Sequence, residues 1–251
     1  MMLGDILTVM WKERKELFTE RETMWGTLVS FLGPLIMVAA LGIVAPWQVG
    51  TAWVETPMSL IVALFVSLMF GGMTAGSIAG ERERHTLETL LASRLRDQAI
   101  LLGKVGIAVC FASACALGTV LFGMVTVNAT HWMGRLLLYP PMVLIGNLVL
   151  SLLTATLSAS TGVFVSLKAA TVREAEQNIM ALLAGGSMVL GWLPILALKA
   201  VPGLEALLSE VVRDLHFAQV FAVLLSLLIA LDAGILVAAK RRFRRARLIL
   251  V

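Results

Sequence analysis

The sequence predicts an all-α, polytopic membrane protein, on the basis of its composition, its long apolar segments and the placement of its charges. Of the 251 residues, 59% are apolar and only 14% are charged. Soluble domains are about 45–50% apolar and about 25% charged. Mean hydropathy is +0.92, so too few polar side chains remain to cover a water-soluble globule. These values exclude a disordered chain, a disulfide scaffold and an ordinary cytosolic enzyme.

Six segments are long and apolar enough to cross a bilayer as helices. About 20 residues rising about 1.5 Å each match a hydrocarbon layer about 30 Å thick. The segments cover residues 25–45, 58–79, 105–127, 141–167, 179–198 and 217–239. Pro140 and Pro141 mark the start of the fourth segment, because proline is tolerated in the first turn of a helix. We therefore predict one transmembrane domain over residues 1–251.

The basic residues fix the predicted orientation of these segments. Seventeen of the 20 Lys and Arg residues lie in the N-terminal segment 1–24, the loops 80–104 and 168–178, and the tail 240–251. Cytoplasmic segments carry the excess of basic residues, so we expect both termini in the cytoplasm and the chain in the cell (plasma or inner) membrane. The basic tail favours contact with anionic lipid headgroups over nucleic acid.

Three polar stretches carry the periodicity of an amphipathic helix. In residues 1–24, an apolar stripe that includes Leu3, Leu7 and Trp11 predicts an interfacial elbow helix before the first span. Packing against another subunit is the alternative. On the opposite side, residues 199–216 contain a leucine-rich stripe over 204–216, which predicts a re-entrant or surface helix.

The third stretch is the loop 80–104. Leu87, Leu90, Leu91 and Leu95 share one face of a helix, and charges of both signs border it. Such a helix suits either the groove of a protein partner or the lipid interface, and periodicity alone does not separate the two.

Within the spans, two features stand out. Small residues recur every fourth position at Gly106, Cys110, Ala114 and Gly118, which predicts close helix packing in lipid. Asp232 is the only charged residue inside the predicted spans. A buried carboxylate in lipid faces either a substrate or ion path, or a hydrogen-bonding partner such as the Ser and Thr residues of the fourth span.

The motifs of several enzyme classes are absent from the sequence. Gly103 and Lys104 lack the upstream Gly and the following Ser or Thr of a phosphate-binding loop. No His-Glu-x-x-His or Gly-x-Ser-x-Gly pattern occurs, and the three histidines are scattered. We therefore expect no catalytic residues and no metal site in this chain.

The loop 80–104 resembles the cytoplasmic loop of ABC transporter permeases of the type-2 export class, which includes subunits for sodium or drug efflux. In that family an acidic start precedes Gly-Thr-Leu-Glu-x-Leu-Leu, and Leu-x-Gly-Lys opens the next span. Thr86, Leu87, Glu88, Leu90, Leu91, Gly103 and Lys104 match this pattern, and the Trp-Lys-Glu-Arg-Lys-Glu-Leu opening at 11–17 is similar to the family's elbow. His85 stands where the family commonly has Gly, and Arg94 where it commonly has Pro, so we expect a differently shaped turn.

The resemblance implies a permease subunit that couples ATP hydrolysis in a separate ATPase subunit to substrate export. ATP and magnesium would bind that partner, and this chain would bind no cofactor. A second permease subunit, identical or paralogous, would complete the path. The resemblance implies that the loop docks on the ATPase, with acidic residues meeting basic ones and leucines filling a groove. The coupling residues it implies are Glu81, Arg82, Glu83, Thr86, Leu87, Glu88, Leu90 and Leu91.

Two other function classes remain as alternatives. A secondary transporter or channel would call for inverted repeats and more than one intramembrane charge, and an integral membrane enzyme would call for a polar constellation within the spans. An adjacent reading frame that encodes an ATPase with a phosphate-binding loop would favour the permease. The sequence does not identify the cargo.

Overall fold

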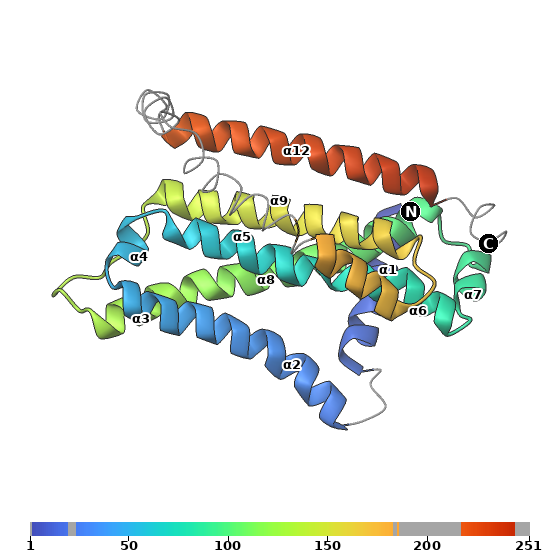
Figure 1. The fold of residues 1–251 in the computed structure, drawn as a ribbon, viewed down its shortest axis with the longest axis horizontal. Coiled ribbons are helices and arrows are strands. Elements are labelled where there is room, and N and C mark those ends of the chain that lie inside the picture. Colours follow the sequence, from blue (N-terminus) through green and yellow to red (C-terminus); the bar gives the residue numbers. More distant parts are fainter. Residues whose placement is uncertain (1, 20–23, 183–184, 186–216, 244–251) are drawn as a thin grey trace.

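The computed structural model describes residues 2–19, 24–182, 185 and 217–243. Every regular element in those ranges is a helix, as predicted (Figure 1). Residues 172–182 are also helical. The named helices are α1 (Met2–Thr19), α2 (Met24–Ala39), a π-helical turn (Ala40–Val44), α3 (Ala45–Val49), α4 (Ala52–Glu55), α5 (Met58–Gly71), a 3₁₀ segment (Gly72–Gly76), α6 (Ser77–Glu83), α7 (Leu87–Ala92), α8 (Asp97–Thr130), α9 (Pro141–Ser166) and α12 (Phe217–Arg242).

Four helices in the described ranges are long and apolar enough to cross a membrane. They are Leu32–Val49, Asp97–Thr130, Pro141–Ser166 and Phe221–Arg242, and they match the first, third, fourth and sixth predicted segments. The second segment becomes α5, which has only 14 residues, followed by the 3₁₀ segment and α6. The fifth segment falls mainly outside the described residues, as does all of 199–216. The chain is therefore membrane-embedded, and six spans stay a prediction.

The core forms where α5, α8 and α9 pack against one another, with α12 lying along α9 and α1 and α2 against α8 (Figure 1). In α8 the fully buried small residues include Ala112 and Ala116, which are spaced four residues apart. The predicted stripe is wrong for Cys110 and Ala114, which are exposed. Both stripes repeat every four residues on one helix, so only the packing partners decide which of them is buried.

The break between α5 and α6 is held against α9 by side-chain hydroxyls. Ser158 donates a hydrogen bond to the Leu68 carbonyl at 2.6 Å, and Thr74 donates to a carbonyl of α9 at 2.9 Å. Two backbone N–H groups at the start of α6 donate to Ser166 Oγ at 3.0 and 2.9 Å. A broken helix at membrane depth needs such partners, because lipid offers none. The hydroxyls of α9 therefore serve the backbone of the broken helix.

The π-helical turn in the first span has a similar explanation. Pro46 has no N–H group and cannot donate to the carbonyl of Gly42, four residues earlier. The Thr126 hydroxyl of α8 lies 3.1 Å from that carbonyl oxygen and supplies the missing donor. The irregular turn is thus satisfied by the neighbouring helix.

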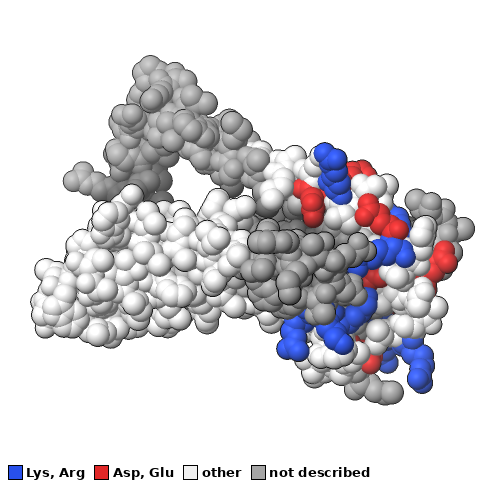
Figure 2. Space-filling view, turned by 90° about the horizontal axis from the view of Figure 1, so that it is seen from below, with Lys and Arg blue, Asp and Glu red and all other residues white. Residues whose placement is uncertain are grey.

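The charged side chains gather at one end of the molecule (Figure 2). The elements that meet there are α1, α6, α7, the start of α8 and the end of α12 (Figure 1). The same segments hold most of the basic residues in the sequence, so the predicted one-sided placement of charge holds in three dimensions for the described residues.

Candidate functional site

Four charged side chains (Lys12, Glu13, Glu81 and Lys104) form an ion cluster at the charged end. We call it the buried ion cluster because all of its members except the partly exposed Lys12 are buried. Lys104 is only 1% exposed, and its Nζ lies 2.5 Å from Glu13 Oε1 and 3.7 Å from Glu81 Oε1. It also donates to the Ser77 carbonyl at 3.2 Å. Lys12 pairs with the same Glu81 oxygen. The cluster carries two charges of each sign and joins α1, α6 and α8.

Glu81 is held in its ionised form by this cluster. Burial alone would raise the pKa of Glu81, but hydrogen bonds from Lys12 and Thr86 and the charge of Lys104 lower it below the ordinary value of 4.5. A depressed pKa means that the stabilisation is complete above about pH 4.5 and is lost as the pH falls through the lower, folded-state value. The cluster is therefore fully formed at neutral pH.

The turn between α6 and α7 has left-handed backbone at His85, where φ is 55°. Glycine adopts this conformation without the steric cost that a side chain meets. Ser93, before Arg94, has φ −64° and ψ 161°, the extended conformation that a residue preceding proline takes. At both departures from the family pattern the backbone therefore takes the shape that glycine or proline would favour, contrary to the expectation of a differently shaped turn.

His85→Gly is expected to stabilise the chain by up to about 1 kcal/mol, because a left-handed side chain costs about 1–2 kcal/mol and glycine's unfolded-state entropy offsets part of it. Thermal unfolding in detergent, followed by far-UV circular dichroism, measures the change. Thr89→Gly, at an exposed position of α7, is the control and should lower stability by up to about 1 kcal/mol. Equal losses in both variants would contradict the strain at His85.

The leucine face of α7 points into the molecule. Leu87 is 7% exposed and belongs to a core cluster with Val9, Ile100 and Phe243. Leu90 and Leu95 pack against the same cluster. The structure places Leu87 in the chain's own core, and the docking of these leucines on a partner stays a prediction. The side chain of Leu91 lies outside the described residues.

Two further predicted coupling residues join α6 to the chain after α9. Arg82 donates to the Ala169 carbonyl and, at 3.4 Å, to the Leu167 carbonyl. Glu83 accepts a hydrogen bond from the Val172 N–H at 3.1 Å, at the start of the helix over 172–182. The helix dipole favours a cation at the end of a helix and an anion at its start, so both contacts are electrostatically favourable.

Of the predicted coupling residues, Glu88 projects from α7 into solvent. Thr86 is also exposed and donates to Glu81 within the chain. Arg84, His85, Thr89 and Ala92 are exposed beside Glu88, and sequence reasoning did not single them out as a surface. We define these five residues (Arg84 and His85 in the turn before α7, and Glu88, Thr89 and Ala92 on α7) as the outer face of α7. Its inner face contacts the core cluster, which also contains Val9 of α1 and Val105 of α8.

The family model of the ABC-2 type transporter matches residues 5–185, which is most of the chain. This chain belongs to the ABC-2 type transporter family. The match includes α1, the buried ion cluster, α7, α8 and α9. Neither the curated proteins nor the solved structures gave a match. The protein is thus a membrane component of an ABC-2 type transporter, a kind of subunit that is generally not itself catalytic.

Asp232 lies in α12 of this ABC-2 type protein, beyond the matched residues. Its side chain is buried, with 6% exposed, and neither carboxylate oxygen accepts a hydrogen bond from a described residue. The expected partners, the hydroxyls of α9, instead bond to backbone carbonyl or N–H groups. The structural role predicted for Asp232 requires a hydrogen-bond donor, and the described residues supply none.

Sequence reasoning missed the burial of Lys104 and Glu13. Lys104 stands just before a span, a position typical of membrane-anchoring residues. Glu13 lies among exposed charges of α1. Their pairing depends on the crossing of α1 and α8, which no spacing in the sequence encodes. The only available signal was the Gly103-Lys104 pair itself, because a glycine before a lysine permits a close helix approach.

Proposed function

We propose that this chain is the permease subunit of an ATP-driven ABC exporter, with a separate ATP-hydrolysing subunit docked on the outer face of α7. The observation that carries the proposal is the position of α7 within an ABC-2 type chain. It is a six-residue helix at the charged end, exposed on one face and packed on the other against the elements that begin the spans. Force applied to the outer face would reach α1, α6 and α8 together through the core cluster and the buried ion cluster.

The remaining parts of the proposal follow from the family. ATP and magnesium bind the partner ATPase, a second permease subunit (identical or paralogous) completes the path, and both termini lie in the cytoplasm of a cell-membrane protein. Export is the proposed direction of transport. A secondary transporter or channel is the alternative, and it predicts no stable complex with an ATPase.

Charge reversal on the outer face is expected to weaken docking. Glu88→Lys should lower recovery of the ATPase subunit, and substrate-stimulated ATP hydrolysis, by roughly tenfold or more, as expected for a central interface residue. The measurement is co-purification with a candidate ATPase subunit that is co-expressed with this chain, followed by hydrolysis assays.

Glu176→Lys is the matched control, because Glu176 is an exposed acidic residue on the helix over 172–182 and the charge change is identical. It should leave recovery unchanged. Full assembly and coupling in the Glu88 variant would contradict docking on this face, and failure of any ATPase to co-purify with the wild-type chain would contradict the permease proposal.

We propose that Asp232 serves the translocation path and not the internal packing of this chain. Asp232→Asn keeps the shape of the side chain and removes its charge, so assembly should persist while transport is lost. If Asp232 handles a cation, the lost activity is cation-dependent transport. Thermal stability should not fall, because no hydrogen bond from a described residue is removed and an ionisable group in a span costs about 2.5–3.5 kcal/mol. A clear loss of stability with transport intact would assign Asp232 a structural role.

A further inference from the structure

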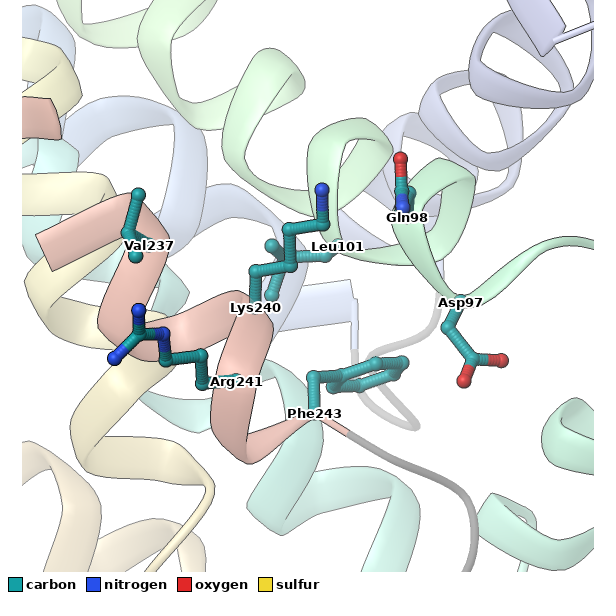
Figure 3. A pocket seen from close by; sticks show the side chains of 7 residues that line it. All are labelled: Asp97, Gln98, Leu101, Val237, Lys240, Arg241 and Phe243. Atoms are coloured by element: carbon teal, nitrogen blue, oxygen red, sulfur yellow. The ribbon is translucent and has the colours of Figure 1, made fainter.

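A cavity of about 420 Å³ lies at the charged end, between the start of α8 and the end of α12 (Figure 3). Its wall from α8 includes Gln98 and Leu101, and its wall from α12 includes Val237, Lys240 and Arg241. The Lys240 side chain extends from α12 toward α8 (Figure 3). This volume falls within the range of about 300–1,000 Å³ typical of small-ligand sites.

On each wall of the cavity, a polar residue lies one helical turn from an apolar residue. On α12, apolar Val237 lies one turn before Lys240 and Arg241. On α8, polar Gln98 lies one turn before apolar Leu101. The two helices run in opposite directions here, so Val237 and Leu101 lie on the side of the spans. Gln98, Lys240 and Arg241 lie toward the charged end. This is the order in which a bilayer passes from acyl chains to headgroups. One apolar residue, Phe243, also lines the cavity at the charged end.

Two cations, Lys240 and Arg241, line the cavity. Arg242 and Lys168 do not line it; they lie 4.8 and 5.5 Å from the centre of the Phe164 ring of α9. One carboxylate, Asp97, also lines the cavity, in the first turn of α8 where the helix dipole favours it. Basic pockets between transmembrane helices on one membrane side suit anionic lipid headgroups.

We propose that this cavity binds an anionic glycerophospholipid from the leaflet on the charged side. The phosphodiester pairs with Lys240, while Arg241, whose side chain extends away from α8, adds positive charge at the rim (Figure 3). The Gln98 amide contacts the headgroup alcohol, and the acyl chains begin along Leu101 and Val237. The site ties α12, which lies beyond the family match, to the start of α8. The proposal does not depend on an ATPase partner.

Native mass spectrometry of the full chain in detergent tests the proposal. Wild type should retain phosphatidylglycerol in preference to phosphatidylcholine. The double variant Lys240→Ala/Arg241→Ala should bind phosphatidylglycerol roughly 30-fold more weakly, as expected for the loss of two basic residues near an anionic headgroup. The control Arg94→Ala/Arg96→Ala removes two exposed basic residues that do not line the cavity and should bind as wild type does.

A second variant separates the cavity from the charge. Gln98→Trp places a large ring at an exposed lining position and keeps both cations, so it should also lose phosphatidylglycerol while far-UV circular dichroism shows an unchanged helix content. Equal retention of both lipids by wild type, or equal losses in the two double variants, would overturn the site. Displacement of the lipid by millimolar inorganic phosphate would overturn a lipid ligand in favour of a free phosphate ion.

Discussion

Lys104→Met is expected to destabilise the chain by about 3–5 kcal/mol, because it leaves Glu13 buried without its closest cation. Lys104 is 1% exposed and Glu13 is 7% exposed, so water cannot replace the lost partner without opening the interface between α1 and α8. Thermal or denaturant unfolding in detergent measures the loss. Methionine is close to lysine in volume, so the cavity left behind is small and the effect reports the charge.

Two further variants test whether the pair or the packing is responsible. Lys15→Met removes an exposed cation of α1 that lies 5.0 Å from the Trp11 ring, and it should cost no more than about 1 kcal/mol. Adding Glu13→Leu to Lys104→Met should recover much of the loss, since replacing both members of a buried pair by apolar residues is often near neutral. A double variant as unstable as the sum of its parts would show that the two charges are not coupled.

Gly103→Ala is expected to destabilise the same interface by about 1–3 kcal/mol through overpacking. A Cβ atom at Gly103 would lie 2.6 Å from Val9 Cβ and 3.2 Å from the Ile6 carbonyl oxygen. Neither contact is the end of a flexible side chain, so α1 itself would have to move away from α8. That movement would also lengthen the distances in the buried ion cluster.

Gly106 provides the matched control on the same face of α8. A Cβ atom there would lie 3.3 Å from Met10 Sδ, and a methionine side chain can move aside. Gly106→Ala should therefore be neutral or stabilise by up to about 1 kcal/mol, the gain in helix propensity over glycine. Equal effects at the two positions would contradict close backbone approach at Gly103.

Hydrophobic segments and prolines predicted the bounds of some helices well. The fourth segment was expected at 141–167 and α9 spans Pro141–Ser166, because consecutive prolines end the preceding chain and start the helix. The third was expected to start at residue 105, yet α8 starts at Asp97. At about 1.5 Å per residue its 34 residues extend about 51 Å, so the helix continues beyond the hydrocarbon layer into polar sequence that a hydropathy rule does not count.

The candidate site was predictable as a segment but not as a set of contacts. Periodicity placed Leu87 and Leu90 on one face, and family resemblance drew attention to Glu81 and Glu88. Tertiary packing decides which of these residues point into the chain's own core. Glu81 and Leu87 are buried, whereas Glu88 is exposed. Charge pairs between segments about 70–90 residues apart, such as Lys12 with Glu81, leave no periodic trace in the sequence.

The hydroxyl contacts between α9 and the broken helix bear on how this part of the protein can move. A stretch with Gly71, Gly72 and Gly76 between two helical pieces would ordinarily act as a hinge. Here Ser158, Thr74 and Ser166 attach the chain to α9 before, within and after the break. These attachments oppose an independent pivot of the two pieces, so we expect a displacement of α6 to move α9 with it.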